Sequence, residues 1–579
     1  MTAELPWKLL LCAGLVVVVA SLWSGLATAE VVIRGVSDEV AANVLAHMRL
    51  DDEPCEIASE RIRFRFDRAE PQIHRALEPF GLYGAEVSGT LAFPDGGCWL
   101  ATFDITAGAP VVITELELAV VGDGSTEPAF QALLDKSRLK LSAPLIHSDY
   151  ETLKAELAFT ARELGFFDAR FDRRTLQVTP DTLSATVALV LDTGRRYHFG
   201  ELRIASEVLN PQLVGRYVEF KPGSPYEQRA IRKLRSDLAR GEYFSTINVT
   251  TERKADFSVD VDVKLSAGRR VRYGIGLGYG TDTGPIVSSD MVVRWLNQRG
   301  HRLELDAQAS EVEQSFSADY RIPGKRPQRD WYSLYGGMSW RDSDAIETKT
   351  RKIGGRETRF HTSRWRSNRF LEYVQEDYRV DDVWEQTYTL VPGYTLTYLV
   401  ANATDRPTLG LRLGAEVLGA SEAVLADSTF LRLRAFGKTI LPLSPRARLL
   451  LRGEAGFTIT DDFDAVPPTW RFYAGGDNSV RGYAYQSLGE VDDSGRALGG
   501  ERLITGSAEV DWRLTDSWSA AVFADAGNVG EDNLLEDLPW SLGVGIRWYS
   551  PLGPIRVDVA FPQQQKSGFR LHVSMGPDL

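Results

Sequence analysis

The chain has 579 residues, too many for one small domain and enough for several. Its net charge of −13 argues against nucleic acid as the main partner. Beyond residue 29 there is no run of about 18 apolar residues, so we expect no transmembrane helix there, although membrane strands, which alternate apolar and polar residues, would escape this test.

Residues 1–29 have the features of a signal peptide. Lys8 gives a positive start, residues 9–20 are apolar, and Ala27-Thr28-Ala29 is a small-residue cleavage site. We therefore expect an exported protein. The alternative is an anchor helix that is retained.

Two cysteines, Cys55 and Cys98, remain after this segment. In an oxidising compartment such a pair predicts a disulfide bond, and the alternative is two partly buried, unpaired thiols. Neither the cysteines nor the scattered histidines have the spacing of a metal site. We therefore expect no metal and no cofactor.

Residues 30–266 carry a weak repeat that occurs three times. Its mark is a helical run ending in glycine and aromatic residues, at 77–83, 164–167 and 238–244. Glycine suits a helix end because it adopts positive φ without steric cost. Together with the strand-like runs around the helices, the repeat predicts three domains of β-α-α-β-β order, at 30–109, 110–195 and 196–266.

The predicted helix of the third domain has a basic side, formed by Arg229, Arg232, Lys233 and Arg235. A basic helix face either docks an acidic partner or is a solvated surface. The sequence leaves both interpretations open.

From residue 267 the helical period gives way to strict alternation, which is typical of strands. The first such run has glycine at every second position, at Gly274, Gly276, Gly278 and Gly280. The last run has an apolar face opposite Arg570, His572 and Ser574, and this face consists of Phe569, Leu571, Val573 and Met575. A soluble sandwich is the alternative, but the helix-free length, the Trp and Tyr at the ends of the apolar faces and the export signal favour a membrane barrel over 267–579.

The loop at 471–483 is rich in turn residues, yet it contains Val480, Arg481, Gly482 and Tyr483. An arginine side chain is a fixed fork of donors that suits carboxylates. Glu509 and Asp525 fall at lumen-facing positions of two consecutive predicted strands. The sequence therefore predicts that the loop folds into the barrel and brings Arg481 to both carboxylates.

These residues match a known family, and the chain resembles the Omp85 superfamily of outer-membrane assembly proteins. The resemblance is carried by Gly475 and Gly476, Val480 to Tyr483, Glu509 within 506–509, and the segments 523–527 and 550–554. It implies a barrel of sixteen strands, periplasmic POTRA domains, and an infolded sixth extracellular loop whose arginine engages the aspartate and glutamate.

The three repeats and the ending at 575–579 resemble the translocation and assembly module branch of that superfamily. This resemblance implies an outer-membrane location, outer-membrane clients such as autotransporters, and an inner-membrane-anchored partner of the TamB type that spans the periplasm. The first and last barrel strands would form a lateral gate, and the glycines would either weaken this seam or make room for the loop. The candidate edge for the partner is 31–35.

Other functions remain as alternatives. A general barrel-assembly factor of the same superfamily has five POTRA domains, and two-partner secretion pores have two together with a plug helix. A role in phospholipid transport to the outer membrane is also open. An enzyme is not expected, because the sequence has no Gly-x-Ser-x-Gly, His-Glu-x-x-His or P-loop motif.

Overall fold

The structure is a computed structural model. It describes residues 30–48, 50, 53–55, 57–94, 98–343, 347–380, 383–404, 406–492, 496–531, 533–550, 553–563, 568–576 and 578. The expected signal peptide, and residues 551, 552, 577 and 579 of the family-like segments, lie outside the described residues. The chain forms two compact units, one with the described residues up to 200 together with 222–229 and 253–259, and one with the remainder. None of the described helices combines the length and the apolar character needed to cross a membrane.

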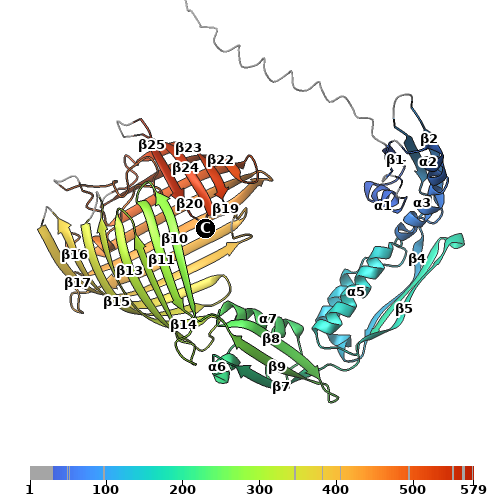
Figure 1. The fold of residues 1–579 in the computed structure, drawn as a ribbon, viewed down its shortest axis with the longest axis horizontal. Coiled ribbons are helices and arrows are strands. Elements are labelled where there is room, and N and C mark those ends of the chain that lie inside the picture. Colours follow the sequence, from blue (N-terminus) through green and yellow to red (C-terminus); the bar gives the residue numbers. More distant parts are fainter. Residues whose placement is uncertain are drawn as a thin grey trace, which may run out of the picture. The chain divides into compact units, whose positions relative to one another are not determined.

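The first domain has a three-stranded sheet with helices packed on one face (Figure 1). The strand order is β1-β3-β2, with β1 parallel to β3 and therefore at an edge. Buried Val44, Ile73 and Phe103 belong to the core between the helices and the sheet. The elements are β1 (Glu30–Arg34), α1 (Asp38–Met48), α2 (Ser59–Phe66), α3 (Ala69–Leu77), η1 (Glu78–Phe80), β2 (Glu86–Ala92) and β3 (Leu100–Thr106). The short helix α2 was not predicted, because its alternating Arg and Phe residues lack a helical apolar stripe.

The second domain repeats this plan with the strand order β4-β6-β5. Buried Phe130, Leu157 and Leu189 join its helices to its sheet. The elements are β4 (Val112–Val121), η2 (Asp123–Thr126), α4 (Pro128–Lys136), α5 (His147–Glu163), β5 (Arg170–Thr179), η3 (Pro180–Thr182) and β6 (Ser184–Asp192).

The third domain has the strand order β7-β9-β8. Its elements are β7 (His198–Ser206), α6 (Pro211–Gly215), α7 (Gln228–Arg240), β8 (Phe244–Arg253) and β9 (Ser258–Ala267). The repeated glycine mark behaves as predicted at Gly81 and Gly165, which adopt φ of 75° and 82°. At the third mark the prediction is wrong by one residue, because Glu242 rather than Gly241 takes the left-handed conformation, with φ of 57°.

The rest of the chain forms a single sheet of sixteen strands in chain order, which curls into a barrel (Figure 1). The predicted fold class, three small α+β domains followed by a sixteen-stranded barrel, is therefore confirmed. The strands are β10 (Val271–Gly280), β11 (Gly284–Val293), β12 (Arg302–Ala309), β13 (Glu313–Pro323), β14 (Asp330–Asp342), β15 (Glu347–Phe360), β16 (Trp365–Val380), β17 (Val383–Ala401), β18 (Gly410–Ala420), β19 (Phe430–Ser444), β20 (Ala447–Thr460), β21 (Arg502–Arg513), β22 (Trp518–Gly530), β23 (Trp540–Ser550), β24 (Gly553–Pro562) and β25 (Arg570–Met575).

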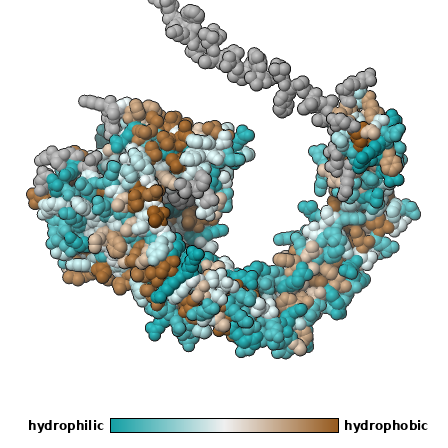
Figure 2. Space-filling model, viewed as in Figure 1, coloured by the Kyte–Doolittle hydropathy of each residue, from teal (hydrophilic) through white to brown (hydrophobic). Residues whose placement is uncertain are grey.

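The barrel has an apolar exterior. Figure 2 shows apolar residues gathered in patches over its outer wall. Outward positions alternate along each strand, so that Leu542, Val544 and Ile546 of β23 are all about half exposed. Trp518 and Trp548 stack side by side on neighbouring strands at one rim, with ring centroids 5.8 Å apart. A wall with apolar faces ending in tryptophan is suited to a lipid bilayer.

The first and last strands meet at one end only. The Thr281 N–H donates to the Val573 carbonyl at 3.0 Å, and the Val573 N–H donates to the Thr281 hydroxyl at 2.5 Å. Between β10 and the described residues of β25 no further ladder forms. Leu571, Val573 and Met575 lie in β25 as predicted, whereas Phe569 precedes the strand. The seam between β10 and β25 is therefore the weakest junction of the barrel wall.

Candidate functional site

The long loop between β20 and β21 folds into the barrel and is itself well packed. Phe472, Val480 and Tyr483 are buried in a cluster with Leu503 and Val529 of the barrel wall. The Tyr483 hydroxyl donates to the Trp540 carbonyl at 3.3 Å. The two glycines of the motif, Gly475 and Gly476, have φ of 107° and 98°, which explains their residue type.

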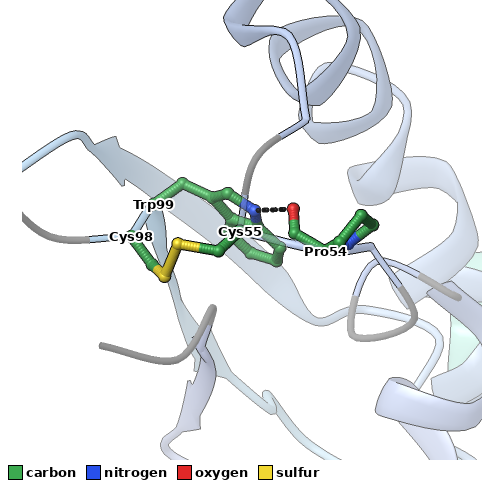
Figure 3. The surroundings of a disulfide bond; sticks show 4 residues. All are labelled: Pro54, Cys55, Cys98 and Trp99. Atoms are coloured by element: carbon green, nitrogen blue, oxygen red, sulfur yellow. Dashed lines mark hydrogen bonds between the residues drawn. A yellow bond between two sulfur atoms is a disulfide. The ribbon is translucent and has the colours of Figure 1, made fainter. Parts of the chain in front are cut away.

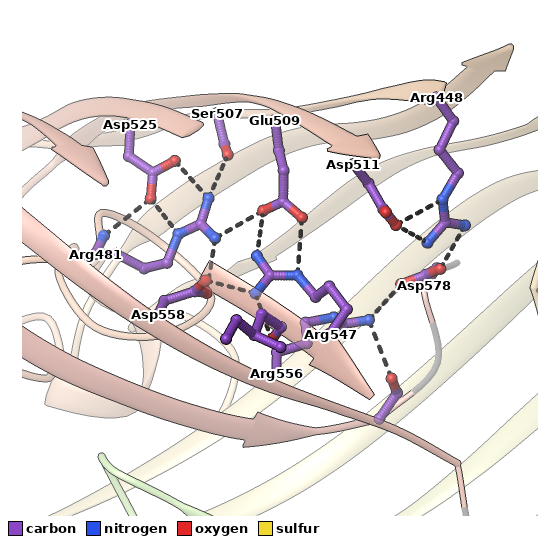
Figure 4. Close-up of polar contacts among 12 residues, drawn as sticks. Arg448, Arg481, Ser507, Glu509, Asp511, Asp525, Arg547, Arg556, Asp558 and Asp578 are labelled. Carbon is purple, nitrogen blue, oxygen red and sulfur yellow. Dashed lines mark hydrogen bonds and ion pairs between the residues drawn. The ribbon is translucent and has the colours of Figure 1, made fainter. Parts of the chain in front are cut away.

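The loop places Arg481 against the predicted carboxylates (Figure 4). Its Nε donates to Asp525 Oδ2 at 2.7 Å and its Nη2 to Asp525 Oδ1 at 2.9 Å, which is a bidentate pair. Its Nη1 donates to Glu509 Oε2 at 2.8 Å. The Arg481 backbone N–H also donates to Asp525 Oδ2, at 3.1 Å. Arg481, Asp525 and Glu509 are all buried, so the contacts are shielded from water.

The structure adds residues that the sequence did not reveal as partners. Asp558 of β24 accepts from Arg481 Nη1 at 3.0 Å and from Arg547 Nη1 at 2.5 Å. Arg547 of β23 also donates through Nε to Glu509 Oε1 at 3.2 Å. Ser507 accepts from Arg481 Nη2 at 3.2 Å. Two arginines and three carboxylates thus form one network across four strands and the loop, which we call the loop lock.

Strand alternation was the signal that could have found these additional residues. Asp558 and Arg547 occupy lumen-facing positions opposite apolar neighbours in the sequence, as Glu509 and Asp525 do. Alternation assigns a residue to a face, but it does not say how far along the barrel axis the residue lies. That height depends on the stagger between strands.

A second buried network lies on the same wall (Figure 4). Asp578, which follows β25, is buried inside the barrel and accepts from Arg556 Nη2 at 2.5 Å. Its other oxygen lies 2.7 Å from Arg448 Nη1. Arg448 Nη2 also donates to Asp511 Oδ2 at 2.6 Å. The segment that follows the last strand is therefore anchored to the lumen wall.

The glycines of β10 face the lumen, where β11 side chains cover them. A Cβ on Gly274 would come within 1.9 Å of Asp290 Oδ1, and a Cβ on Gly276 within 2.4 Å of Ser288 Oγ. Near Gly278 the nearest atom belongs to Ile286, at 3.6 Å. Only Gly280 has a loop atom among its neighbours, Asp477 Oδ2 at 3.7 Å. At Gly274 and Gly276 the side chains of β11 therefore leave no room for a Cβ.

The two remaining cysteines lie in the first domain, where Cys55 and Cys98 form a disulfide bond (Figure 3). The adjacent Trp99 Nε1 donates to the Pro54 carbonyl at 3.3 Å, so the indole ties the same two segments together. This bond supports the fold of the domain and is remote in sequence from the loop lock.

The basic side of α7 is largely paired with neighbouring groups. Lys233 donates to Asp237 at 2.6 Å and lies 2.8 Å from Glu219. Burial lowers the pKa of Lys233, but these two hydrogen-bonded carboxylates outweigh it and raise the pKa above its ordinary value. Arg235 donates to the Val249 carbonyl. These pairings favour the interpretation of a solvated, internally compensated helix face.

Comparison with known proteins agrees with this geometry. A model of the Omp85 superfamily domain matches residues 296–578, which include the loop and most of the barrel. The chain carries an Omp85 superfamily domain. A model of the first POTRA domain of TamA matches residues 30–107, the first of the three small domains.

Relatives of this chain include outer-membrane protein assembly factors BamA. The BamA of Nitratidesulfovibrio vulgaris is 24% identical over 443 residues, which cover 72% of this chain and 55% of the relative. The BamA of Neisseria meningitidis is 23% identical over 524 residues, covering 77% of this chain and 64% of the relative. The chain thus spans less than two thirds of the length of either relative.

A solved structure has the same fold. It is BamA from Haemophilus ducreyi lacking POTRA domains 1–3, which superimposes with a TM-score of 0.66 at 17% identity and covers 80% of this chain and 99% of that one. With its apolar outer wall and its family domains, the protein is an outer-membrane barrel with POTRA domains on the periplasmic side.

Proposed function

We propose that this protein promotes the insertion and secretion of autotransporter-type outer-membrane proteins through a lateral gate between β10 and β25. The role is structural rather than catalytic: the barrel offers a strand edge, and the client folds against it. The seam is the observation that carries this proposal. β10 extends over ten residues, whereas among the residues that the structure describes the bonds across the seam are those between Thr281 and Val573.

The exposed face of β10 supports the same function. Tyr273, Ile275 and Leu277 are among the most exposed apolar side chains of the barrel, at 73%, 84% and 75%. An unpaired edge with apolar, outward side chains can template an incoming strand of matching alternation. In lipid, each backbone pair formed with a client strand would satisfy polar groups that have no water to bind.

The loop lock supports a barrel that stays intact while its seam opens. Arg481 joins the loop to β21, β22 and β24, which all lie on the β25 side of the seam. We propose that this wall remains fixed and that movement is concentrated at the seam. Arg481, Glu509 and Asp525 would then act as the lock that keeps the loop inside.

We further propose that an inner-membrane-anchored partner of the TamB type binds the first POTRA domain. The match of residues 30–107 to a TamA-type first POTRA domain supports this choice. The edge strand β1 pairs with β3 on one side and offers its other side for strand addition. Phospholipid delivered by such a partner is a second candidate cargo.

A BamA-like role in general barrel assembly is the competing function, and the BamA relatives favour it. Co-purification from envelopes separates the two. A single elongated inner-membrane protein among the partners supports the proposal, whereas a set of lipoproteins supports the BamA-like role.

Locking the seam tests the gate. Tyr279 and Met575 lie two residues from Thr281 and Val573 on the two sides of the seam and line the same cavity, so Tyr279→Cys and Met575→Cys place one thiol on each side. We expect that oxidation of the double variant stops surface display of an autotransporter and that reduction restores it. Each single variant under the same oxidation is the matched control. Normal display by the crosslinked protein would show that lateral opening is not needed.

A further inference from the structure

Three side chains from three separate segments meet at the end of the seam where the described residues of its two strands are hydrogen-bonded. Asp282 lies in the turn between β10 and β11, Asp477 lies in the infolded loop, and His572 lies on β25. One oxygen or nitrogen atom of each lies within 4.8 Å of the others. The cluster therefore includes both sides of the seam and the loop that fills the lumen beside it.

The hydrogen bonds show which atoms of this cluster donate and which accept. The Asp477 backbone N–H donates to Asp282 Oδ2 at 2.5 Å. The Gly482 N–H donates to His572 Nε2 at 2.8 Å, so that nitrogen carries the lone pair. The ring proton is then on Nδ1, which faces Asp477 Oδ1 at 2.5 Å. His572 thus accepts from the loop at Nε2 and donates to the loop at Nδ1.

This arrangement argues against a metal site. A neutral histidine that binds a cation through Nδ1 must carry its proton on Nε2. In this structure Nε2 faces the Gly482 N–H, and two donors would then oppose each other. The three residues instead form a chain of hydrogen bonds. The Asp477 backbone N–H donates to the Asp282 carboxylate, and the Asp477 carboxylate accepts from His572 Nδ1.

Contacts made by nearby loop residues on both sides of Asp477 hold it in place. Gly476 sits directly on Asp282, where a Cβ would come within 2.4 Å of Oδ2. Four residues farther on, Arg481 is fixed by the loop lock. The loop therefore cannot follow both edges of the seam when they separate.

We infer that Asp282, Asp477 and His572 form a latch through which the infolded loop holds the seam closed. This inference rests on the proposed gate between β10 and β25. When the seam opens, either the Asp477–Asp282 bond or the Asp477–His572 bond must break, because one end of the latch moves with β10 and the other with β25. Asp477 and His572 are positioning residues: they act on the strands and do not touch a client.

The seam can be measured directly, without any client. Leu277 of β10 and Leu571 of β25 point outward, 75% and 47% exposed, and can carry nitroxide labels on cysteines. The native Cys55 and Cys98 are joined in a disulfide and do not react. Pulsed EPR of the full chain in lipid then reports the distance across the seam.

We expect Asp477→Ala and His572→Ala each to raise the population with longer inter-label distances by roughly tenfold, the effect of losing one charge-assisted hydrogen bond. His572→Gln can still accept from Gly482 and donate to Asp477, and it should restore most of the short-distance population. Asn478→Ala, an exposed neighbour on the same loop, is the matched control and should leave the distribution unchanged.

Two outcomes overturn the latch: an unchanged distribution in both alanine variants, or an equal change in Asn478→Ala. Should Asp477→Ala fail to fold, Asp282→Ala removes the other contact of the latch instead, the bond that Asp282 accepts from the Asp477 backbone N–H. Client display is measured separately. A seam that opens more often without any effect on display keeps the latch and refutes the proposed gate, whereas an unchanged seam refutes the latch whatever the display result.

Discussion

Arg481 shows how a single buried cation can organise a polar lumen. Its guanidinium group contacts Asp525, Glu509 and Asp558, and it lies 3.4 Å from the centroid of the Phe523 ring. Arg547 shares two of these carboxylates. Each charge in the network is compensated only while the others are present, because none of them has free access to water.

Removing Arg481 should therefore be costly. We expect Arg481→Ala to lower the free energy of unfolding by about 3–5 kcal/mol, because it leaves buried carboxylates unpaired. Arg481→Lys should be intermediate, since an ammonium group keeps the charge but not the bidentate fork. Urea unfolding, followed by the heat-dependent mobility of the barrel, measures both variants.

The matched control is Arg513→Ala on β21, whose guanidinium group makes an exposed bond to the Pro445 carbonyl. Its loss should change the free energy of unfolding by less than about 0.5 kcal/mol. An equal effect of the Arg481 and Arg513 variants would contradict the stabilising role of the loop lock.

Among the secondary-structure elements, β25 is unusual for its shortness. It has six residues, whereas β10 has ten, and the chain leaves the sheet after it to bury Asp578 in the lumen. The anchoring arginines, Arg448 and Arg556, come from β20 and β24. Contacts inside the barrel therefore help to set the length of the last strand, together with its hydrogen-bond ladder to β24. They also set how much of β10 remains unpaired.

Particular residues and elements show which parts of the fold and of the candidate site can be predicted from the sequence. Alternation placed Glu509 and Asp525 on the lumen side, because successive side chains of a strand point to opposite faces. It could not place His572 beside Asp477, since that contact depends on the path of a long loop. Likewise, helical spacing predicted α5 but not α2, and it predicted a glycine at φ > 0 where the third domain uses Glu242.

The disulfide bond gives a prediction for the first domain. Cys55→Ser, Cys98→Ser and the double variant should each lower the free energy of unfolding of this domain by the same amount, at most roughly 4 kcal/mol for the loop that the bond closes. All three lose the same bond between residues 43 positions apart. Hydrogen exchange of α3 and β3 in the intact chain, across a urea series, measures the change.

If the double variant lost about twice as much as each single variant, the cysteines would contribute independently. The effect would then come from packing and not from the bond. Cys98 is buried beside Trp99, so a packing term has to be checked in this way.

Over the whole molecule, two of the strands at sheet edges matter for the proposed function. One is β10 in the barrel wall, and the other is β1 at the edge of the first domain. In a strand, successive N–H groups point to opposite sides. Because Glu30 donates to Trp99 on the β3 side, the N–H groups of Val31 and Ile33 point away from the sheet.

Partner binding through β1 can be tested at Ile33. Ile33→Pro removes an outward N–H and should reduce capture of the TamB-type partner at least tenfold, because proline cannot donate to an added strand. Ile33→Ala loses similar packing but keeps the N–H and should capture the partner almost normally. Pull-down of the partner from solubilised envelopes compares the two variants, and equal capture would exclude strand addition at β1.

The buried position of Asp578 affects where an affinity tag can be placed on the protein. Extra chain placed directly behind Asp578 would draw this carboxylate away from Arg448 and Arg556. Affinity handles are better placed away from this carboxylate and from the β1 edge. Labelling or capture beside Asp578 would report on a molecule whose last strand has already been disturbed.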